Sequence, residues 1–167
     1  MCKKYINATI NCYKSLIKNN DSIVAYSIPF NQIESVRTKE TENIEICIKD
    51  FYIVTDINIL GTNDETADNP LNKKQTIDVI VRITKCDRIP ENQIGKDLAS
   101  FSISTKDMYE QNQISTACFD FVNCKQVITI KELPLPAGTG KYVIKVLMKL
   151  STETDYTIQS MMQLNVI

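Results

Sequence analysis

The stretch that decides the fold is KYVIKVLMKL, residues Lys141 to Leu150, in which the polarity alternates from one residue to the next. One row of this stretch is apolar and consists of Tyr142, Ile144, Val146, Met148 and Leu150. The intervening row is more polar and consists of Val143, Lys145, Leu147 and Lys149. Side chains of a β-strand point alternately to two faces, so this pattern predicts a strand with one buried face.

The same period of two recurs along most of the chain, in segments rich in Ile, Val, Thr, Tyr and Phe, which favour strands. It is clear at Ile44, Ile46 and Ile48, and again in the segment TIDVIVRIT (76–84). We expect strands near residues 3–12, 22–32, 43–60 (with a break near Asp50 left open), 75–86, 99–104, 118–130, 141–150 and 156–166. This pattern predicts an all-β fold, an antiparallel β-sandwich of about seven or eight strands in a single domain over residues 1–167.

Residues 5–18 fit two structures. Ile6, Ile10 and Ile17 have the spacing of an amphipathic helix. Ile6, Ala8 and Ile10 also alternate as in a strand, and KNNDS (18–22) is typical of a hairpin turn. We favour strand–turn–strand, and the helix stays as the alternative.

The segment LPLPAGTGKY (133–142) ends as phosphate-binding loops often do, in Gly-Thr-Gly-Lys. The Walker motif needs a glycine where Leu135 stands, and a serine or threonine where Tyr142 stands. A strand pattern rather than a helix follows. The segment therefore predicts a turn, with Gly138 and Gly140 supplying the positive φ that a turn requires.

The chain has no histidine, which excludes the Ser-His-Asp and Cys-His arrangements and the imidazole general base. We therefore expect a protein that is not an enzyme and that has no cofactor. Six cysteines occur without a C-x-x-C pair, so no structural zinc site is indicated. We favour reduced thiols, and three disulfides stay open as the alternative; the cysteines are Cys2, Cys12, Cys47, Cys86, Cys118 and Cys124.

An acidic loop at 61–74 is the candidate metal site. Asp64, Glu65 and Asp68 lie in it, with Asp56 upstream, and calcium prefers several oxygen ligands from a flexible loop. The spacing is not that of an EF-hand, and two lysines follow closely, so we favour a solvated acidic loop, and the calcium site stays as the alternative.

Three methionines are the candidate partner-binding residues. Met148, Met161 and Met162 lie near each other if the last two strands pair, and methionine suits adaptable contact surfaces. We favour the interpretation that they fill the core, and the contact surface stays as the alternative.

Charge and hydropathy limit the classes of binding partner and the cellular compartment that we expect. The formal net charge is −1, with no basic patch for nucleic acid or for an anionic membrane. No signal peptide and no apolar run of about 20 residues is found, so we expect a cytoplasmic protein. The abundance of Ile, Lys and Asn suggests an AT-rich bacterial genome.

The C-terminal third, VITIKELPLPAGTGKYVIKVLMKL (127–150) followed by DYTIQSMMQLNVI (155–167), resembles the final hairpin of bacterial immunoglobulin-like sandwiches. In those proteins a Leu-Pro-x-Gly-x-Tyr corner leads into an alternating strand; here an additional Gly-Lys precedes Tyr142. The N-terminal half is similar to an uncharacterised family of small cytoplasmic bacterial β-sandwich proteins. This resemblance implies an immunoglobulin-like fold and carries over no catalytic residues.

Two functional hypotheses follow. The first is a non-enzymatic interaction or accessory module of a bacterial cytoplasmic system, which binds a protein partner or a second copy through a sheet edge or end loops. The second is a calcium- or small-ligand-binding sandwich that uses the loop 61–74.

Overall fold

The computed structural model describes residues 6–20, 22–38, 45–62, 76–86, 95–104, 113–115 and 119–167. Every helix or strand element in these ranges is a β-strand, which confirms the prediction of an all-β protein. The strands are β1 (Ile6–Tyr13), β2 (Leu16–Asn19), β3 (Ser22–Tyr26), β4 (Gln32–Ile33), β5 (Val36–Arg37), β6 (Ile46–Thr62), β7 (Thr76–Lys85), β8 (Lys96–Ser104), β9 (Gln113–Ser115), β10 (Phe119–Leu135), β11 (Gly140–Leu150) and β12 (Thr157–Val166).

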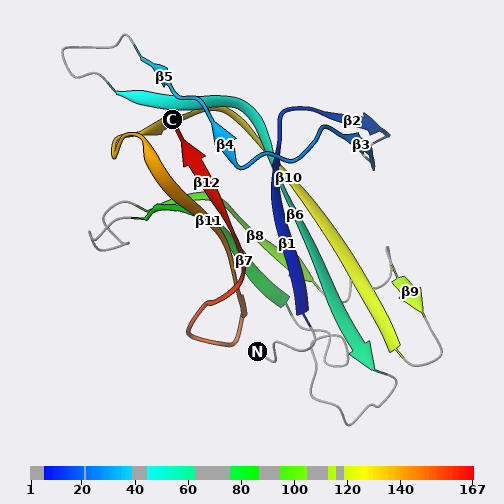
Figure 1. Cartoon of the computed structure of the whole chain (residues 1–167). Coiled ribbons are helices and arrows are strands. Elements are labelled where there is room, and N and C mark those ends of the chain that lie inside the picture. The colour runs from blue at the N-terminus through cyan, green and yellow to red at the C-terminus, as the bar shows by residue number, and fades with distance from the viewer. Residues whose placement is uncertain are drawn as a thin grey trace.

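The strands form two five-stranded sheets and one separate hairpin (Figure 1). Sheet I has the order β1-β6-β10-β9, with β5 beside β6, and sheet II has the order β4-β12-β11-β7-β8. The hairpin consists of β2 and β3. Pairing within the sheets is antiparallel except between β12 and β4, which run parallel.

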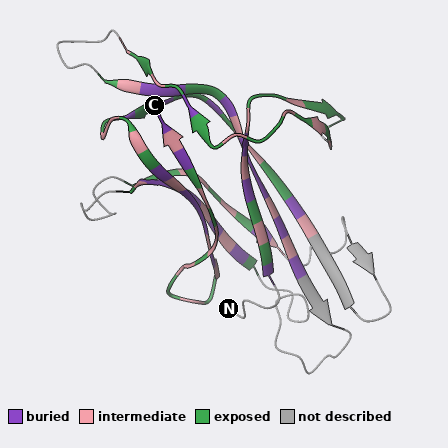
Figure 2. Cartoon of the chain, in the orientation of Figure 1, coloured by how far each residue is buried: buried purple, intermediate pink, exposed green. Residues whose placement is uncertain are grey.

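Both sheets bury their apolar rows in one core, which makes the fold a sandwich (Figure 2). The apolar row predicted for residues 141–150 lies in this core from Tyr142 to Met148. Burying side chains of this size contributes about 1.5–3 kcal/mol each. The largest fully buried residues are Phe51, Ile48, Ile53, Ile57, Ile59, Ile77, Ile144, Met148, Leu164, Val79 and Val81.

The sequence left undecided whether the strand at 43–60 is broken near Asp50. In the structure β6 is continuous there and bends at Asp50. Asp50 has a φ of 59°, in the left-handed region that aspartate tolerates better than most residues. Ile48 is buried before the bend and Phe51 after it, so the buried row changes from even to odd positions. The paired strand β10 makes the same change between Ile130 and Leu133. Both strands therefore bend without exposing their apolar rows.

The N-terminal segment is strand–turn–strand, as favoured from the sequence. β1 replaces the alternative helix, and β2 and β3 form a hairpin whose turn contains Asn20 at a φ of 49°. The predicted strand at 22–32 is interrupted, because β3 ends at Tyr26 and β4 begins at Gln32. The described chain has twelve strands rather than seven or eight. The additional ones are short segments, which alternation over four to eight residues does not reveal.

The chain crosses from sheet I to sheet II at the predicted turn between β10 and β11. Gly138 and Gly140 have φ values of 84° and 138°, as expected. The Tyr142 hydroxyl donates a hydrogen bond of 2.6 Å to the Gly138 carbonyl, and Lys85 Nζ donates one of 2.6 Å to the Ala137 carbonyl. We call residues 135–142, with these bonds, the corner. It fixes the path by which β11 enters the core.

Candidate interaction surface

One side of β12 is open. β11 pairs with β12 along Thr157–Val166, whereas β4 pairs with the other side only at Asn165 and Val166. Among the residues that the structure describes, no strand pairs with the outer side of β12 from Thr157 to Leu164. An open strand edge presents backbone N–H and C=O groups and is a template for pairing with another chain.

The contacts between β12 and the segment that contains β4 show which backbone N–H and C=O groups of β12 point away from β11. The amides of Asn165 and Ile167 donate to the carbonyls of Asn31 and Ile33, at 2.8 and 3.0 Å. Backbone groups of successive residues in a strand point to opposite sides, and β12 is regular from Ser160 onward. The N–H and C=O groups of Met161 and Gln163 therefore also point away from β11, toward the open side.

A bulge limits the regular part of this edge. The register with β11 shifts where Val146 pairs with Ser160 and Leu147 pairs with Ile158, which leaves Gln159 as the additional residue. On the outer face, the side chains of Met161 and Ile158 are 56% and 41% exposed. We call Ser160–Leu164 the open edge.

The structure separates the three methionines that were predicted to form a partner-binding surface. The last two strands do pair, but Met148 lies opposite Thr157, whereas Met161 and Met162 lie opposite Lys145 and Ile144. Met148 is fully buried, so it fills the core. Met162 is half-buried and packs against the core, and Met161 is exposed.

Met162 is held by a contact between the sheets. The Cys12 thiol of β1 donates to the Met162 thioether at 3.7 Å. Burial raises the pKa of the Cys12 thiol to about 12, which keeps it protonated and unreactive at neutral pH. Cys12, Cys47, Cys86 and Cys124 are free thiols, consistent with the reduced form, while Cys2 and Cys118 lie outside the described residues.

The candidate calcium ligands do not come together in the described part of the chain. Asp56 lies six residues before the end of β6 at Thr62, about 20 Å along the strand. Its carboxylate accepts a hydrogen bond from Asn123, and Lys125 Nζ lies 3.8 Å from it. Asp64, Glu65 and Asp68 lie outside the described residues, so the calcium site stays a prediction. Within the described ranges, no cluster of three or more cysteine or carboxylate side chains is suited to a metal ion.

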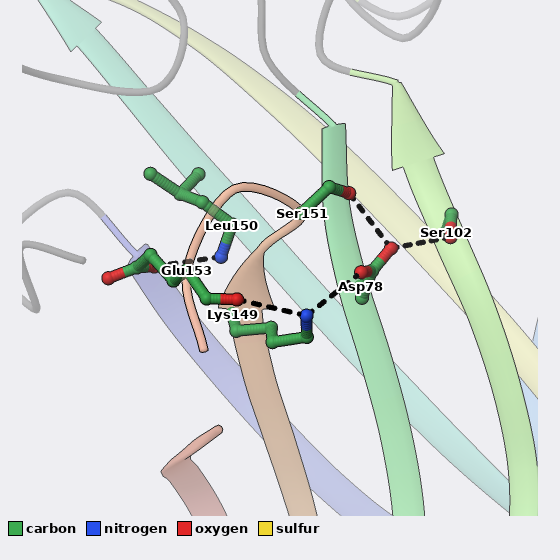
Figure 3. Close-up of polar contacts among 6 residues, drawn as sticks. All are labelled: Asp78, Ser102, Lys149, Leu150, Ser151 and Glu153. Carbon is green, nitrogen blue, oxygen red and sulfur yellow. Dashed lines mark hydrogen bonds and ion pairs between the residues drawn. The ribbon is translucent and has the colours of Figure 1, made fainter. Parts of the chain in front are cut away.

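A polar cluster joins β7, β8 and β11 at one end of sheet II (Figure 3). Asp78 Oδ1 accepts hydrogen bonds from Ser102 at 2.8 Å and from Ser151 at 3.1 Å, and Lys149 Nζ lies 3.7 Å from Asp78 Oδ2. The Ser102 hydrogen bond, together with those from Ser151 and Lys149, lowers the pKa of Asp78. An ionised carboxylate with this many donors is suited to anchoring strands. It is not suited to donating a proton.

Two pockets lie near the C-terminal end of β10. One, of about 290 Å³, borders the corner and is mainly apolar, with Leu133, Leu135 and Tyr142 among its lining residues. The other, of about 420 Å³, is polar and includes Arg37 and Glu132. Burial, and then the nearby Glu132 carboxylate, raise the pKa of the Cys47 thiol in the second pocket. A nucleophilic cysteine needs a lowered pKa, so this thiol is not activated.

The hairpin of β2 and β3 is a second exposed apolar region, and it extends away from the sandwich (Figure 1). Ile17, Val24 and Ile28 are exposed, the last of them at 87%. The Tyr26 ring stacks on Tyr13 at a centroid distance of 4.5 Å, which fixes the base of the hairpin to β1. Sequence reasoning did not identify these residues, because an alternating strand pattern does not show whether a strand leaves the core.

Sequence reasoning also missed Gln163, whose backbone groups point outward at the open edge. The available signal was the composition of TIQSMMQLNV (157–166), which contains no charged residue and no proline. Edge strands usually carry such residues, which prevent unwanted pairing.

No helix in the described ranges is long and apolar enough to cross a membrane.

The chain matches no protein-family model and no curated protein. Among solved structures, it is similar to the CooA pilin subunit from enterotoxigenic Escherichia coli, with 12% sequence identity and a TM-score of 0.36. The match covers 97% of each chain.

Proposed function

We propose that this chain is a non-enzymatic interaction or accessory module, an immunoglobulin-like β-sandwich that binds a protein through the open edge of β12. The observation that carries the proposal is the row of outward-pointing backbone groups at Met161 and Gln163, for which the described chain supplies no strand partner. Added strands bind such edges by main-chain hydrogen bonds, and neighbouring side chains give specificity.

The order of the long strands supports the immunoglobulin-like part of the proposal. When β1, β6 and β10 are taken as strands A, B and E, they are neighbours in sheet I. When β7, β11 and β12 are taken as C, F and G, they are neighbours in sheet II. Immunoglobulin domains divide their strands between two sheets in this way. β8 then extends sheet II, as the additional strands of variable-type domains do.

The corner is a second support. In immunoglobulin-like sandwiches a tyrosine near the start of strand F bonds back to the backbone a few residues upstream. Tyr142 is the third residue of β11, and its hydroxyl donates to the Gly138 carbonyl. The corner thus occurs at the crossing between the two sheets where that fold requires it.

The charge balance supports a protein as the partner. The chain has 19 basic and 20 acidic residues, so it lacks the excess of positive charge that binding to nucleic acid or an anionic membrane requires. For its setting we propose the bacterial cytoplasm; the abundance of Ile, Lys and Asn supports the bacterial part of this proposal.

The test compares two substitutions at one position. Gln163→Pro removes the outward N–H, whereas Gln163→Ala removes the exposed side chain and keeps that N–H. Each tagged full chain is used to purify proteins from a lysate of its source cells, which are then identified by mass spectrometry. We expect a bound partner, which includes an untagged copy of this chain, with the wild type and with Gln163→Ala, and its loss with Gln163→Pro. Equal recovery with all three chains would contradict binding through this edge.

A further inference from the structure

The open edge has defined limits on both sides. Gln159 is the bulge residue at one limit, and Asn165 is already paired with Gln32 of β4 at the other. The five residues between them, Ser160–Leu164, form regular pairs with β11. This segment is centred on Met162, and its two outward-pointing residues, Met161 and Gln163, lie symmetrically about that centre.

The open edge also lacks the features that keep strand edges apart. β12 carries no charged residue and no proline, and Met161 exposes an apolar side chain beside the edge. β1 is an edge strand of sheet I and is also uncharged, but its exposed residues are the polar Asn7 and Thr9. β8, the opposite edge of sheet II, carries Lys96 and Asp97. Among these three described edges, β12 is therefore the least protected against pairing.

We propose, resting on the function proposed above, that the occupant of the open edge is the same edge of a second copy, paired antiparallel across a two-fold axis. The limits of the segment determine the register. Met162 faces Met162 of the second copy at the axis. Met161 of each copy pairs with Gln163 of the other. In an antiparallel ladder such a pair exchanges both of its backbone hydrogen bonds, so all outward groups of Met161 and Gln163 gain partners.

Charge favours a second copy as this occupant. A two-fold axis brings identical residues close together, and a charged edge paired with itself would place like charges opposite each other, which is destabilising. The open edge contains only Ser, Met, Gln and Leu, so it meets itself without this penalty. The net charge of −1 adds little repulsion between whole molecules.

The contact is short, so the dimer is weak. One strand of five residues falls well below the area of a standard protein–protein interface. We expect a dissociation constant on the order of tens of micromolar, and therefore a monomer–dimer equilibrium that depends on concentration. Pairing covers the Met161 side chain, which gives the dimer an apolar contribution beside the backbone bonds.

The experiment is sedimentation velocity on the purified full chain from about 5 to about 500 µM, a range that brackets the expected dissociation constant. We expect the wild type and Gln163→Ala to shift from monomer to dimer, and Gln163→Pro to stay monomeric with an unchanged strand signal in circular dichroism. Met161→Lys places like charges near the axis and should weaken the dimer at least about tenfold, with partial recovery at high salt. This variant serves as the test if Gln163→Pro does not fold.

Several outcomes would overturn the inference. A wild type that is monomeric throughout excludes the second copy as occupant, and so does a dimer that both Gln163→Pro and Met161→Lys leave unchanged. If the wild type is monomeric but a lysate partner is lost with Gln163→Pro, only this inference fails and the proposed function stands. A monomer that also recovers no partner through the edge contradicts both.

Discussion

The two edges of sheet II have the same position in the fold and opposite side-chain chemistry. β8 pairs with β7 on one side, and its first two residues are Lys96 and Asp97. Arg82 of β7 donates to Asp97 at 2.6 Å, and Ser102 of β8 donates to Asp78 of β7. β12 pairs with β11, but no residue of its open edge carries a charge. Since charged side chains oppose unwanted pairing, we expect the β12 edge to be more available for pairing than the charged end of β8.

The largest expected effect is on stability, and it distinguishes the buried Met148 of β11 from the exposed Met161 of β12. Met148→Ala should lower the free energy of unfolding by about 2–5 kcal/mol, because the buried side chain leaves a cavity. Met161→Ala should change it by less than about 0.5 kcal/mol, since Met161 is exposed. Urea unfolding at a low protein concentration, where the monomer prevails, gives both values. Equal losses would mean that the β12 edge is part of the core, and the comparison with β8 would fail.

A smaller effect is expected at the corner, which belongs to neither edge strand. Tyr142→Phe keeps the buried ring and removes the hydroxyl that bonds to Gly138, so we expect a loss of about 1 kcal/mol. For a chain of this size that corresponds to a decrease in Tm of about 2–4 °C. Thermal unfolding measures the decrease, and sedimentation at high concentration serves as the control. If dimerisation changed as well, the corner and the β12 edge would be coupled rather than independent.

The smallest effect concerns the anchoring of β8, and it depends on pH. The lowered pKa of Asp78 means that its ionised form contributes stability above the unfolded-state pKa of about 3.9. This contribution is lost as the pH falls through the lower folded-state pKa. Asp78→Asn should therefore lower Tm at pH 7 and at pH 5, and the difference from the wild type should shrink below about pH 4. A difference that stays constant from pH 7 to pH 3 would show that the charge of Asp78 does not anchor β8.

Local patterns were sufficient to predict the long strands. The alternation in TIDVIVRIT and KYVIKVLMKL placed β7 and β11 correctly, because the two faces of a half-buried strand differ in polarity at every step. The turn signal at 18–22 separated strand from helix at the N-terminus. The glycines at 138 and 140 identified a turn, because few other residues adopt their φ values.

The candidate sites could not be predicted in this way. The structure does not bring Met148 together with Met161 and Met162, because the register of β11 against β12 places Met148 opposite Thr157 and Met161 opposite Lys145. Asp56 lies within β6, whereas Asp64, Glu65 and Asp68 lie outside the described residues, so their grouping as a calcium site stays a prediction. Which strands lie at an edge is likewise a property of the sheet order, and no local pattern encodes it.

By itself, then, the sequence determined the strand character of the chain, the turn between the last long strands and the absence of histidine chemistry. These depend on residue type and on periodicity over a few neighbours. Only the tertiary structure decided that β12 lies beside an open side, that Met161 and Gln163 point toward it, and that Met148 is buried. These depend on pairing between residues far apart in the sequence, where a shift of one position exchanges the buried and exposed faces.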